Sequence, residues 1–195
     1  MAFVAPDPIT SARLVVRPVA ESDLAALLMV NGDEQVTGFL PYATWQSMAD
    51  AEAWYQRMLT LQAGGTALQF VVADRQMGSA IGTCLLFRYD EASARAELGY
   101  VMGRSHWGRG CMREALQALI DWAFDGIALR RLEAEVDLRN ARSAQLLLRL
   151  GFTKEGLLRQ RWITKGLATD VEVYGLLRHE WPGPQPLAAT GTTDA

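Results

Sequence analysis

The central stretch of this chain, residues 103–115, reads Gly-Arg-Ser-His-Trp-Gly-Arg-Gly-Cys-Met-Arg-Glu-Ala. It lies between a β-rich apolar run at 94–102 and a helical run at 112–124. A glycine-rich turn at such a junction presents free backbone N–H groups and the positive end of a helix dipole, and both attract phosphate. The turn lacks the Lys-Ser/Thr pair of a Walker loop and the three-glycine dinucleotide fingerprint. The sequence therefore predicts a phosphate site of another kind.

Composition favours one globular domain. The chain has 195 residues, of which 50% are hydrophobic and 21% charged, with a formal net charge of -3. This slightly acidic balance gives no support for a nucleic-acid partner, and no apolar run is long enough to span a bilayer. We expect a single domain over 1–181 and a disordered tail over 182–195, which is rich in Pro, Gly, Ala and Thr. The N-terminus has no signal-peptide pattern, so a cytoplasmic location is predicted.

The hydrophobic pattern on both sides of the turn predicts a mixed α/β fold. Runs at 67–74, 80–89 and 94–102 are joined by short turns, which favours an antiparallel meander. The run at 131–138 alternates apolar and charged residues and should pair in parallel with 94–102 through a right-handed crossover. Further strands are predicted at 13–19, 152–158 and 170–177, further helices at 22–30, 47–62 and 140–150, and irregular structure at 1–11 and 31–44.

Three blocks of the chain stand in an order that is typical of one enzyme family. They are Glu97-Leu98-Gly99-Tyr100, the central turn, and Asn140-x-x-Ser143 followed by Leu150-Gly151-Phe152. Together they resemble the GCN5-related N-acetyltransferase (GNAT) superfamily over about residues 13–181. The family loop Gln/Arg-x-x-Gly-x-Gly/Ala falls on 107–112, which we call the phosphate loop. Its outer positions are Trp and Met here, a departure familiar in the RimJ/RimL subgroup of ribosomal-protein N-acetyltransferases.

The resemblance implies a twisted, mainly antiparallel sheet with helices on both faces, in which the parallel strands 94–102 and 131–138 splay apart. It implies acetyl-CoA as co-substrate and no metal. The loop amides suit the pyrophosphate, and the strand backbone at 100–102 can pair with the pantetheine amides as an added strand would. The implied CoA-binding residues are Tyr100, Val101, Met102, Trp107, Gly108, Arg109, Gly110, Cys111, Met112, Asn140 and Arg149. Asn140 is also a good helix N-cap, and Arg149 also complements a helix dipole.

Three residues are candidates for proton transfer. An attacking amine must first lose a proton, and Glu97 can accept it, although an ion pair with Arg95 or with an arginine of a neighbouring strand explains the residue equally well. Many family members carry a tyrosine acid on the following helix, but that position is Leu147 here. Ser143 is then the candidate that protonates the CoA thiolate, unless it is an ordinary helical serine. Glu135 is a second, weaker candidate for the base.

The predicted function is transfer of an acetyl group from acetyl-CoA directly to a primary amine, such as a protein N-terminal amine. Direct attack makes an acetylated Cys111 unnecessary. Two alternatives stay open: a small-molecule acetyltransferase acting on a polyamine or drug-like amine, and a non-catalytic acyl-CoA-binding or sensing module. Phe39, Tyr42 and Trp45 either line the acceptor pocket or belong to the core, and Trp54 is expected in the core. The acceptor and the oligomeric state, including a homodimer, are left open.

Overall fold

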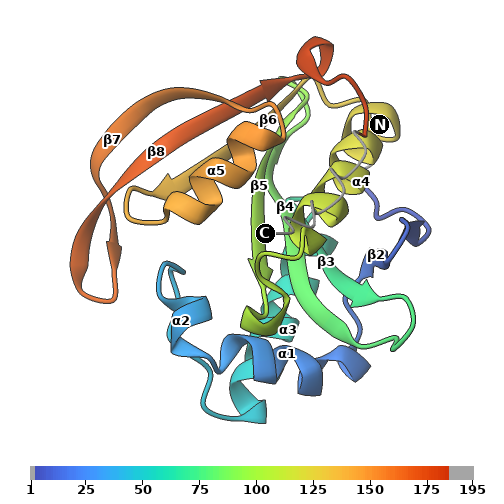
Figure 1. The fold of residues 1–195 in the computed structure, drawn as a ribbon, viewed down its shortest axis with the longest axis vertical. Coiled ribbons are helices and arrows are strands. Elements are labelled where there is room, and N and C mark those ends of the chain that lie inside the picture. Colours follow the sequence, from blue (N-terminus) through green and yellow to red (C-terminus); the bar gives the residue numbers. More distant parts are fainter. Residues whose placement is uncertain (1–2, 185–195) are drawn as a thin grey trace, which may run out of the picture.

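The computed structural model describes residues 3–184 and forms an α/β sandwich around one eight-stranded sheet (Figure 1). The strands are β1 (Ile9–Thr10), β2 (Leu14–Pro18), β3 (Ala67–Asp74), β4 (Ala80–Asp90), β5 (Arg95–Met102), β6 (Arg131–Asp137), β7 (Thr153–Thr164) and β8 (Leu167–Leu177). The helices are α1 (Leu24–Asn31), α2 (Glu34–Thr37), α3 (Met48–Ala63), α4 (Cys111–Asp125) and α5 (Ala141–Arg149), with short 3-10 turns at Glu21–Asp23, Arg104–His106 and Arg178–Glu180.

The sheet has the strand order β1-β2-β3-β4-β5-β6-β8-β7, and β5 and β6 are its parallel neighbours. Their register contains three residue pairs: Arg95 with Arg131, Ala96 with Leu132, and Glu97 with Glu133. Both strands continue beyond these pairs, β5 to Met102 and β6 to Asp137. They therefore separate after Glu97, which confirms the predicted splay of two parallel strands in a mainly antiparallel sheet.

Helices cover both faces of the sheet, as predicted. Along β3, Phe70 and Val72 belong to one buried cluster with α4 and α5, whereas Val71 belongs to a second cluster with α1 and α3. This alternation follows from the two-residue period of a strand. Fully burying one large apolar side chain contributes about 1.5–3 kcal/mol, so the two clusters fix the positions of the helices against the sheet.

Two segments expected to be irregular contain regular structure. Ile9 and Thr10 form β1 by pairing with Val16 and Val15, within the predicted lead-in. Residues 34–37 form α2, where the Asp33 carboxylate accepts a hydrogen bond of 2.9 Å from the backbone N–H of Gln35. Both elements are short and depend on tertiary contacts or a single cap, so periodicity does not reveal them.

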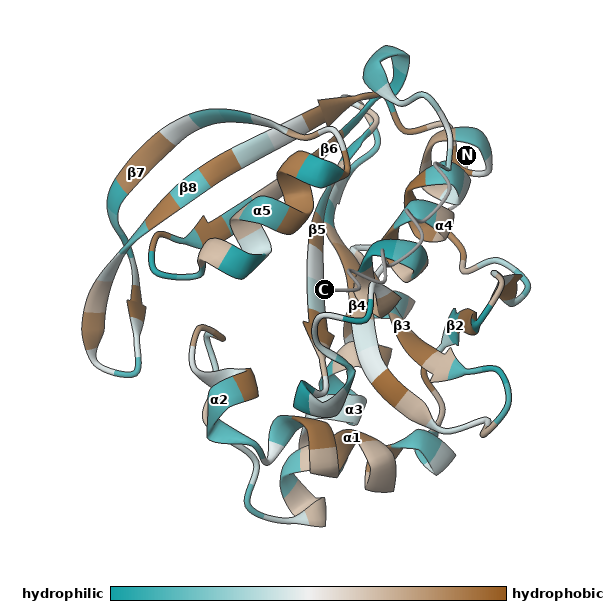
Figure 2. Ribbon diagram, viewed as in Figure 1, coloured by the Kyte–Doolittle hydropathy of each residue, from teal (hydrophilic) through white to brown (hydrophobic). Residues whose placement is uncertain are grey.

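The last two strands are longer than predicted. Residues 159–169, expected to be largely loop, continue β7 and β8 up to a two-residue turn. Lys165 and Gly166 both have positive φ, 50° and 80°, as a tight hairpin turn requires. The hairpin arches away from α5 with β7 as its outer strand (Figure 1), and hydrophilic and hydrophobic residues alternate along β8 (Figure 2).

The core alternative holds for two of the aromatic residues. Trp45 and Trp54 are buried in the second cluster, and their ring centroids lie 5.4 Å apart. Phe39 is exposed, and the half-buried Tyr42 donates a hydrogen bond of 2.9 Å to Asn31. The tail predicted to be disordered falls mostly on residues 185–195, which lie outside the described part of the chain. Within residues 3–184, no helix is long and apolar enough to cross a membrane.

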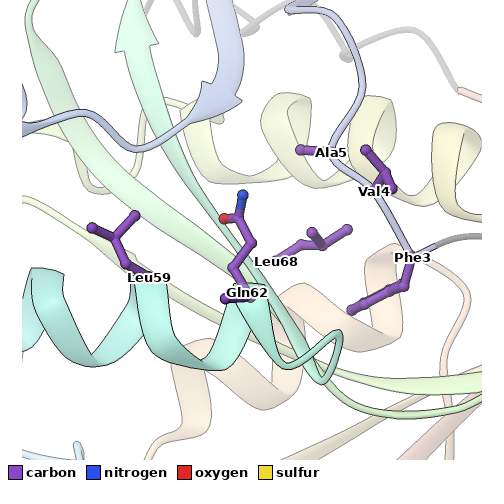
Figure 3. A pocket seen from close by; sticks show the side chains of 7 residues that line it. Phe3, Val4, Ala5, Leu59, Gln62 and Leu68 are labelled. Atoms are coloured by element: carbon purple, nitrogen blue, oxygen red, sulfur yellow. The ribbon is translucent and has the colours of Figure 1, made fainter.

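A cavity of about 480 Å³ lies between the N-terminal segment, the end of α3 and the start of β3 (Figure 3). Its lining is mainly apolar and consists of Phe3, Val4, Ala5, Leu59, Gln62, Ala63 and Leu68. None of the predicted site residues lines it, so the candidate site has to be built from the side chains around β5, α4 and α5.

Candidate active site

The phosphate loop has a backbone conformation that requires glycine. Gly108 and Gly110 have φ values of 72° and 74°, in the left-handed region, and Gly110 is the N-cap of α4. The first N–H groups of an α-helix have no partner within the helix, and the helix dipole makes this end positive. The loop therefore has the geometry expected of an anion site.

The loop is anchored to the N-terminal segment through Glu114, in the first turn of α4. Its carboxylate accepts hydrogen bonds from the Ser11 hydroxyl at 2.7 Å and from the backbone N–H and Nε of Arg13 at 2.8 and 2.7 Å. Burial acts to raise the pKa of Glu114, but these bonds outweigh it and hold the pKa below its usual value. Arg13 also donates to the carbonyl oxygen of Arg109 at 3.0 Å, so this ion pair positions the loop backbone directly.

Trp107 links the loop to two other elements. Its indole N–H donates to the carbonyl oxygen of Met102 at 2.7 Å, and the Arg142 guanidinium on α5 lies 4.9 Å from the ring centroid. Nearby in sequence, the Nε of Arg113 is buried and has no hydrogen-bond partner in the described structure. An unpartnered guanidinium nitrogen in the first turn of α4 fits a site for an anionic group. Arg113 and Arg142 were not among the residues predicted from the sequence.

The other predicted CoA-binding residues fall into two groups. The side chains of Met102, Cys111 and Met112 are buried in the core, so these residues offer their backbone to a ligand. Arg109 and Arg149 are exposed, and Val101 is half-buried. Asn140 is the N-cap of α5 and accepts a bond of 3.2 Å from the backbone N–H of Ser143, which confirms its capping role.

Tyr100 and Ser143 meet on the face of β5 that carries α4 and α5. Their hydroxyl oxygens lie 2.6 Å apart, and the Tyr100 hydroxyl also lies 3.3 Å from the Ser143 carbonyl oxygen. Burial raises the pKa of Tyr100, so the phenol remains protonated at neutral pH. Leu147, at the position where the family resemblance implies a tyrosine, is fully buried. The structure therefore places a tyrosine hydroxyl beside α5 from a different element, β5.

Glu97 lies on the opposite face of β5, because its neighbours Ala96 and Leu98 point into the core beneath α4. Its carboxylate is 2.7 Å from Nη1 of Arg88 on β4, the ion pair with a neighbouring strand that the sequence left open. Burial raises the pKa of Glu97; Arg88 opposes this rise, and Glu135 and Glu133 add to it. The carboxyl is thus a better proton acceptor than a solvent-exposed glutamate.

The Glu97 carboxylate belongs to a larger group of side chains, which we call the Arg88 cluster. Glu135 accepts a bond of 2.6 Å from the Trp162 indole and lies 3.3 Å from Arg161. The Arg88 guanidinium lies 3.8 Å from Glu135 and 5.3 Å from the centroid of the Trp162 ring. The cluster consists of Arg88, Glu97, Glu135, Arg161 and Trp162, and it joins β4, β5, β6 and β7.

The remaining nucleophilic and metal-binding side chains show no such arrangement. Cys84 and Cys111 are both free and buried. His106 is half-buried in the 3-10 turn before the phosphate loop. Among the described residues, no group of three or more His, Cys, Asp or Glu side chains lies close enough to hold a metal ion.

Comparison with known proteins agrees with the predicted family and fold. Residues 13–153 match the family model for the acetyltransferase (GNAT) domain. The chain is 36% identical over 171 residues to the uncharacterized N-acetyltransferase p20 of Bacillus licheniformis, covering 88% of this chain and 96% of that protein. It is 30% identical to the [ribosomal protein uS5]-alanine N-acetyltransferase of Escherichia coli, covering 90% and 93%.

A solved structure, Mycobacterium smegmatis RimJ in complex with CoA-disulfide, superimposes with a TM-score of 0.83 at 24% identity over 91% of this chain and 90% of that one. At this identity the likeness concerns the fold alone. With the sequence matches, it confirms the resemblance drawn from the three sequence blocks. The chain belongs to the GNAT family of N-acetyltransferases.

Proposed function

We propose that the protein transfers the acetyl group of acetyl-CoA directly to a primary amine and that its acceptor is a protein N-terminal amine. One observation carries the proposal. The separation of β5 and β6 begins at Glu97, and beyond it the Tyr100–Ser143 pair lies on one face of β5 while the Glu97 carboxylate lies on the other. A thioester entering from the phosphate-loop side therefore has a proton donor on its own side and a proton acceptor on the acceptor's side.

CoA binding is assigned to residues that have an unpartnered donor group or a backbone that β6 does not pair. The amides of the phosphate loop and the first turn of α4 suit the pyrophosphate, with Arg113 as an additional donor. The backbone of β5 after Glu97 has no partner in β6, and its amides suit the pantetheine amides and the thioester oxygen. Trp107 of the loop and Arg142 of α5 lie against each other, where they can contact the cofactor from the side.

The chemistry uses the two hydroxyls and the carboxylate in named roles. The amine nitrogen attacks the thioester carbonyl carbon, so a C–N bond forms and the C–S bond breaks. The proton lost by the amine goes to Glu97, directly or through water. The departing thiolate takes a proton from Ser143, which takes one from the Tyr100 hydroxyl at 2.6 Å. Because burial raises the pKa of Tyr100, the phenolate takes a proton back from water as the products leave, and Glu97 releases its proton to water, so both groups return to their starting states. Holding the reactants in one site supplies a further large part of the rate.

A protein N-terminal amine is supported by the E. coli relative, whose name states acetylation of an alanine of ribosomal protein uS5. The alternatives are a small amine such as a polyamine, and a sensor that binds acyl-CoA without turnover. The Tyr100–Ser143 pair supports an enzyme, because it provides a hydroxyl donor although Leu147 cannot. A cytoplasmic location stays a prediction, and the oligomeric state stays open.

One assay tests the proposal. The protein is mixed with acetyl-CoA and with peptides that carry a free N-terminal amine, matched N-formylated peptides, or small amines, and free thiol is measured. We expect thiol release with the free-amine peptides and background hydrolysis with the blocked ones. Tight CoA binding without thiol release above background for any acceptor would establish the sensor instead.

A further inference from the structure

The Arg88 guanidinium occupies a position that is suited to a substrate cation. It lies 5.5 Å from the ring centroid of Phe87 and 5.3 Å from that of Trp162, and 2.7 Å and 3.8 Å from the carboxylates of Glu97 and Glu135. Two aromatic faces and two carboxylates around one cation are the groups by which proteins hold ammonium ligands. The cation here is a side chain of the protein itself.

The position of Arg88 is held by the backbone and open to solvent. Arg88 has φ 51°, in the left-handed region, at an irregularity of β4 between Phe87 and Asp90. Its side chain is 43% exposed, whereas that of Glu97 is 11% exposed. An acceptor amine that approaches Glu97 from solvent therefore meets the Arg88 guanidinium first.

The charges around the base are already balanced. Within the Arg88 cluster, Glu97 and Glu135 are matched by Arg88 and Arg161. The neighbouring Glu133 is paired with Arg95 at 2.9 Å and with Arg131 at 2.8 Å. An amine with one positive charge needs only to deliver its proton to Glu97. A polyamine brings a second ammonium group, which would need a carboxylate that no guanidinium has taken.

We propose that Arg88 determines the charge class of the acceptor: its guanidinium fills the cation site formed by Phe87, Trp162, Glu97 and Glu135, so the protein accepts amines with a single positive charge and rejects polyamines. This inference rests on the proposed acetyl transfer to an amine. Arg88 is then a specificity-determining residue, and its position in this chain favours an N-terminal amine over a polyamine as acceptor.

The test compares spermidine with a lysine-free peptide that carries a free N-terminal amine. Arg88→Met removes the charge and keeps the length of the side chain, and Arg88→Lys keeps the charge. Arg95→Met is the matched control, because it removes a guanidinium from the adjacent ion pair with Glu133. Arg88→Gln serves as a second neutral variant if Arg88→Met folds poorly. The measured quantity is the ratio of kcat/KM for spermidine to kcat/KM for the peptide, in which any change of the common base cancels.

We expect this ratio to rise about tenfold, or about 1.4 kcal/mol, in both neutral variants and to stay within about threefold in Arg88→Lys and Arg95→Met. An unchanged ratio in the neutral variants overturns the inference, and so does an equal rise in Arg95→Met. Calorimetric titration of spermidine into the CoA-bound protein separates the two proposals. If no acceptor is acetylated but Arg88→Met binds spermidine about tenfold more tightly, acetyl transfer fails and the cation site stands. If the peptide is acetylated and Arg88→Met binds spermidine no more tightly than the wild type, acetyl transfer stands and the cation site fails.

Discussion

The Tyr100 hydroxyl lies 2.6 Å from the Ser143 hydroxyl and connects β5 to the first turn of α5. The two residues are 43 positions apart in the sequence, and each is unremarkable on its own. Together they form a donor pair next to the separation of β5 and β6. Leu147 stands where the family resemblance implies a tyrosine, and the phenol beside this helix comes from the neighbouring strand β5.

If the pair passes one proton, its two members act as a unit. Ser143→Ala and Tyr100→Phe should each lower kcat about 10- to 100-fold, within the range for a single acid–base group. The kcat of the double variant should be only slightly lower than that of the less active single variant, because removing either hydroxyl breaks the same proton path. Steady-state kinetics of all four proteins, with CoA affinity measured in parallel, make the comparison. Fully additive losses would show that the hydroxyls act separately.

The role of Glu97 predicts a specific pH dependence. If Glu97 is the base, turnover needs its ionised carboxyl, whose pKa is raised by burial. In that case kcat/KM should fall as the pH drops through a value above the ordinary pKa of glutamate. Arg88 favours the ionised form, so Arg88→Met should move this acid limb to higher pH. Glu97→Gln should abolish the limb together with most of the activity. A limb that stays in place in Glu97→Gln would assign the base to another group.

The left-handed conformation of Gly110 makes the phosphate loop sensitive to a side chain. Gly110→Val forces a β-branched residue to φ 74°, a strain of roughly 1–2 kcal/mol, and fills space next to the amides. We expect CoA affinity to fall at least about 100-fold by calorimetry, equivalent to about 2.7 kcal/mol. Gly65→Val is the matched control, since Gly65 has φ 68° in the turn after α3. It should lose stability but keep CoA affinity, and equal losses of affinity in both variants would contradict the assignment.

Glu114 predicts a pH-dependent contribution to stability. Its pKa is lowered in the folded protein, so its stabilising effect is present above the unfolded pKa of about 4.3 and is lost as the pH falls through the folded value. Glu114→Gln should lower the free energy of unfolding by about 1–3 kcal/mol at pH 7. The difference from wild type should shrink at more acidic pH. Urea unfolding across this range, with the exposed Glu52→Gln as control, measures the effect; a difference that does not vary with pH would exclude the ionised carboxylate as its source.

Local signals predicted most of the fold. The alternation of Leu132, Ala134 and Val136 with charged residues located β6, and the glycines of the phosphate loop located the start of α4. The hairpin turn at Lys165-Gly166 is missed by the sequence prediction, which ends one strand at residue 158 and begins the next at residue 170. Helix α2 gave no usable periodicity in four residues.

The site was predictable only in part. Glu97, Ser143 and the loop follow from motifs, but their partners come from long-range geometry. Arg88 reaches Glu97 through a backbone irregularity and a positive φ that no residue of the local sequence demands. Tyr100 was assigned for its backbone, and the place of its hydroxyl depends on how far β5 and β6 separate. The separation of β5 and β6 depends on how the helices pack against the whole sheet, and a short sequence motif does not encode that packing.

The short β5–β6 register has a mechanical consequence. Three residue pairs join the two halves of the sheet, β1 to β5 on one side and β6, β8 and β7 on the other. A ligand that binds between the separated ends of β5 and β6 would connect the two halves of the sheet. It would form the contacts along β5 that β6 does not form there. Bound substrate would then stabilise the sheet as well as react. Amide hydrogen exchange along the end of β5 and the start of α5 should be slower in the ligand-bound protein than in the ligand-free protein.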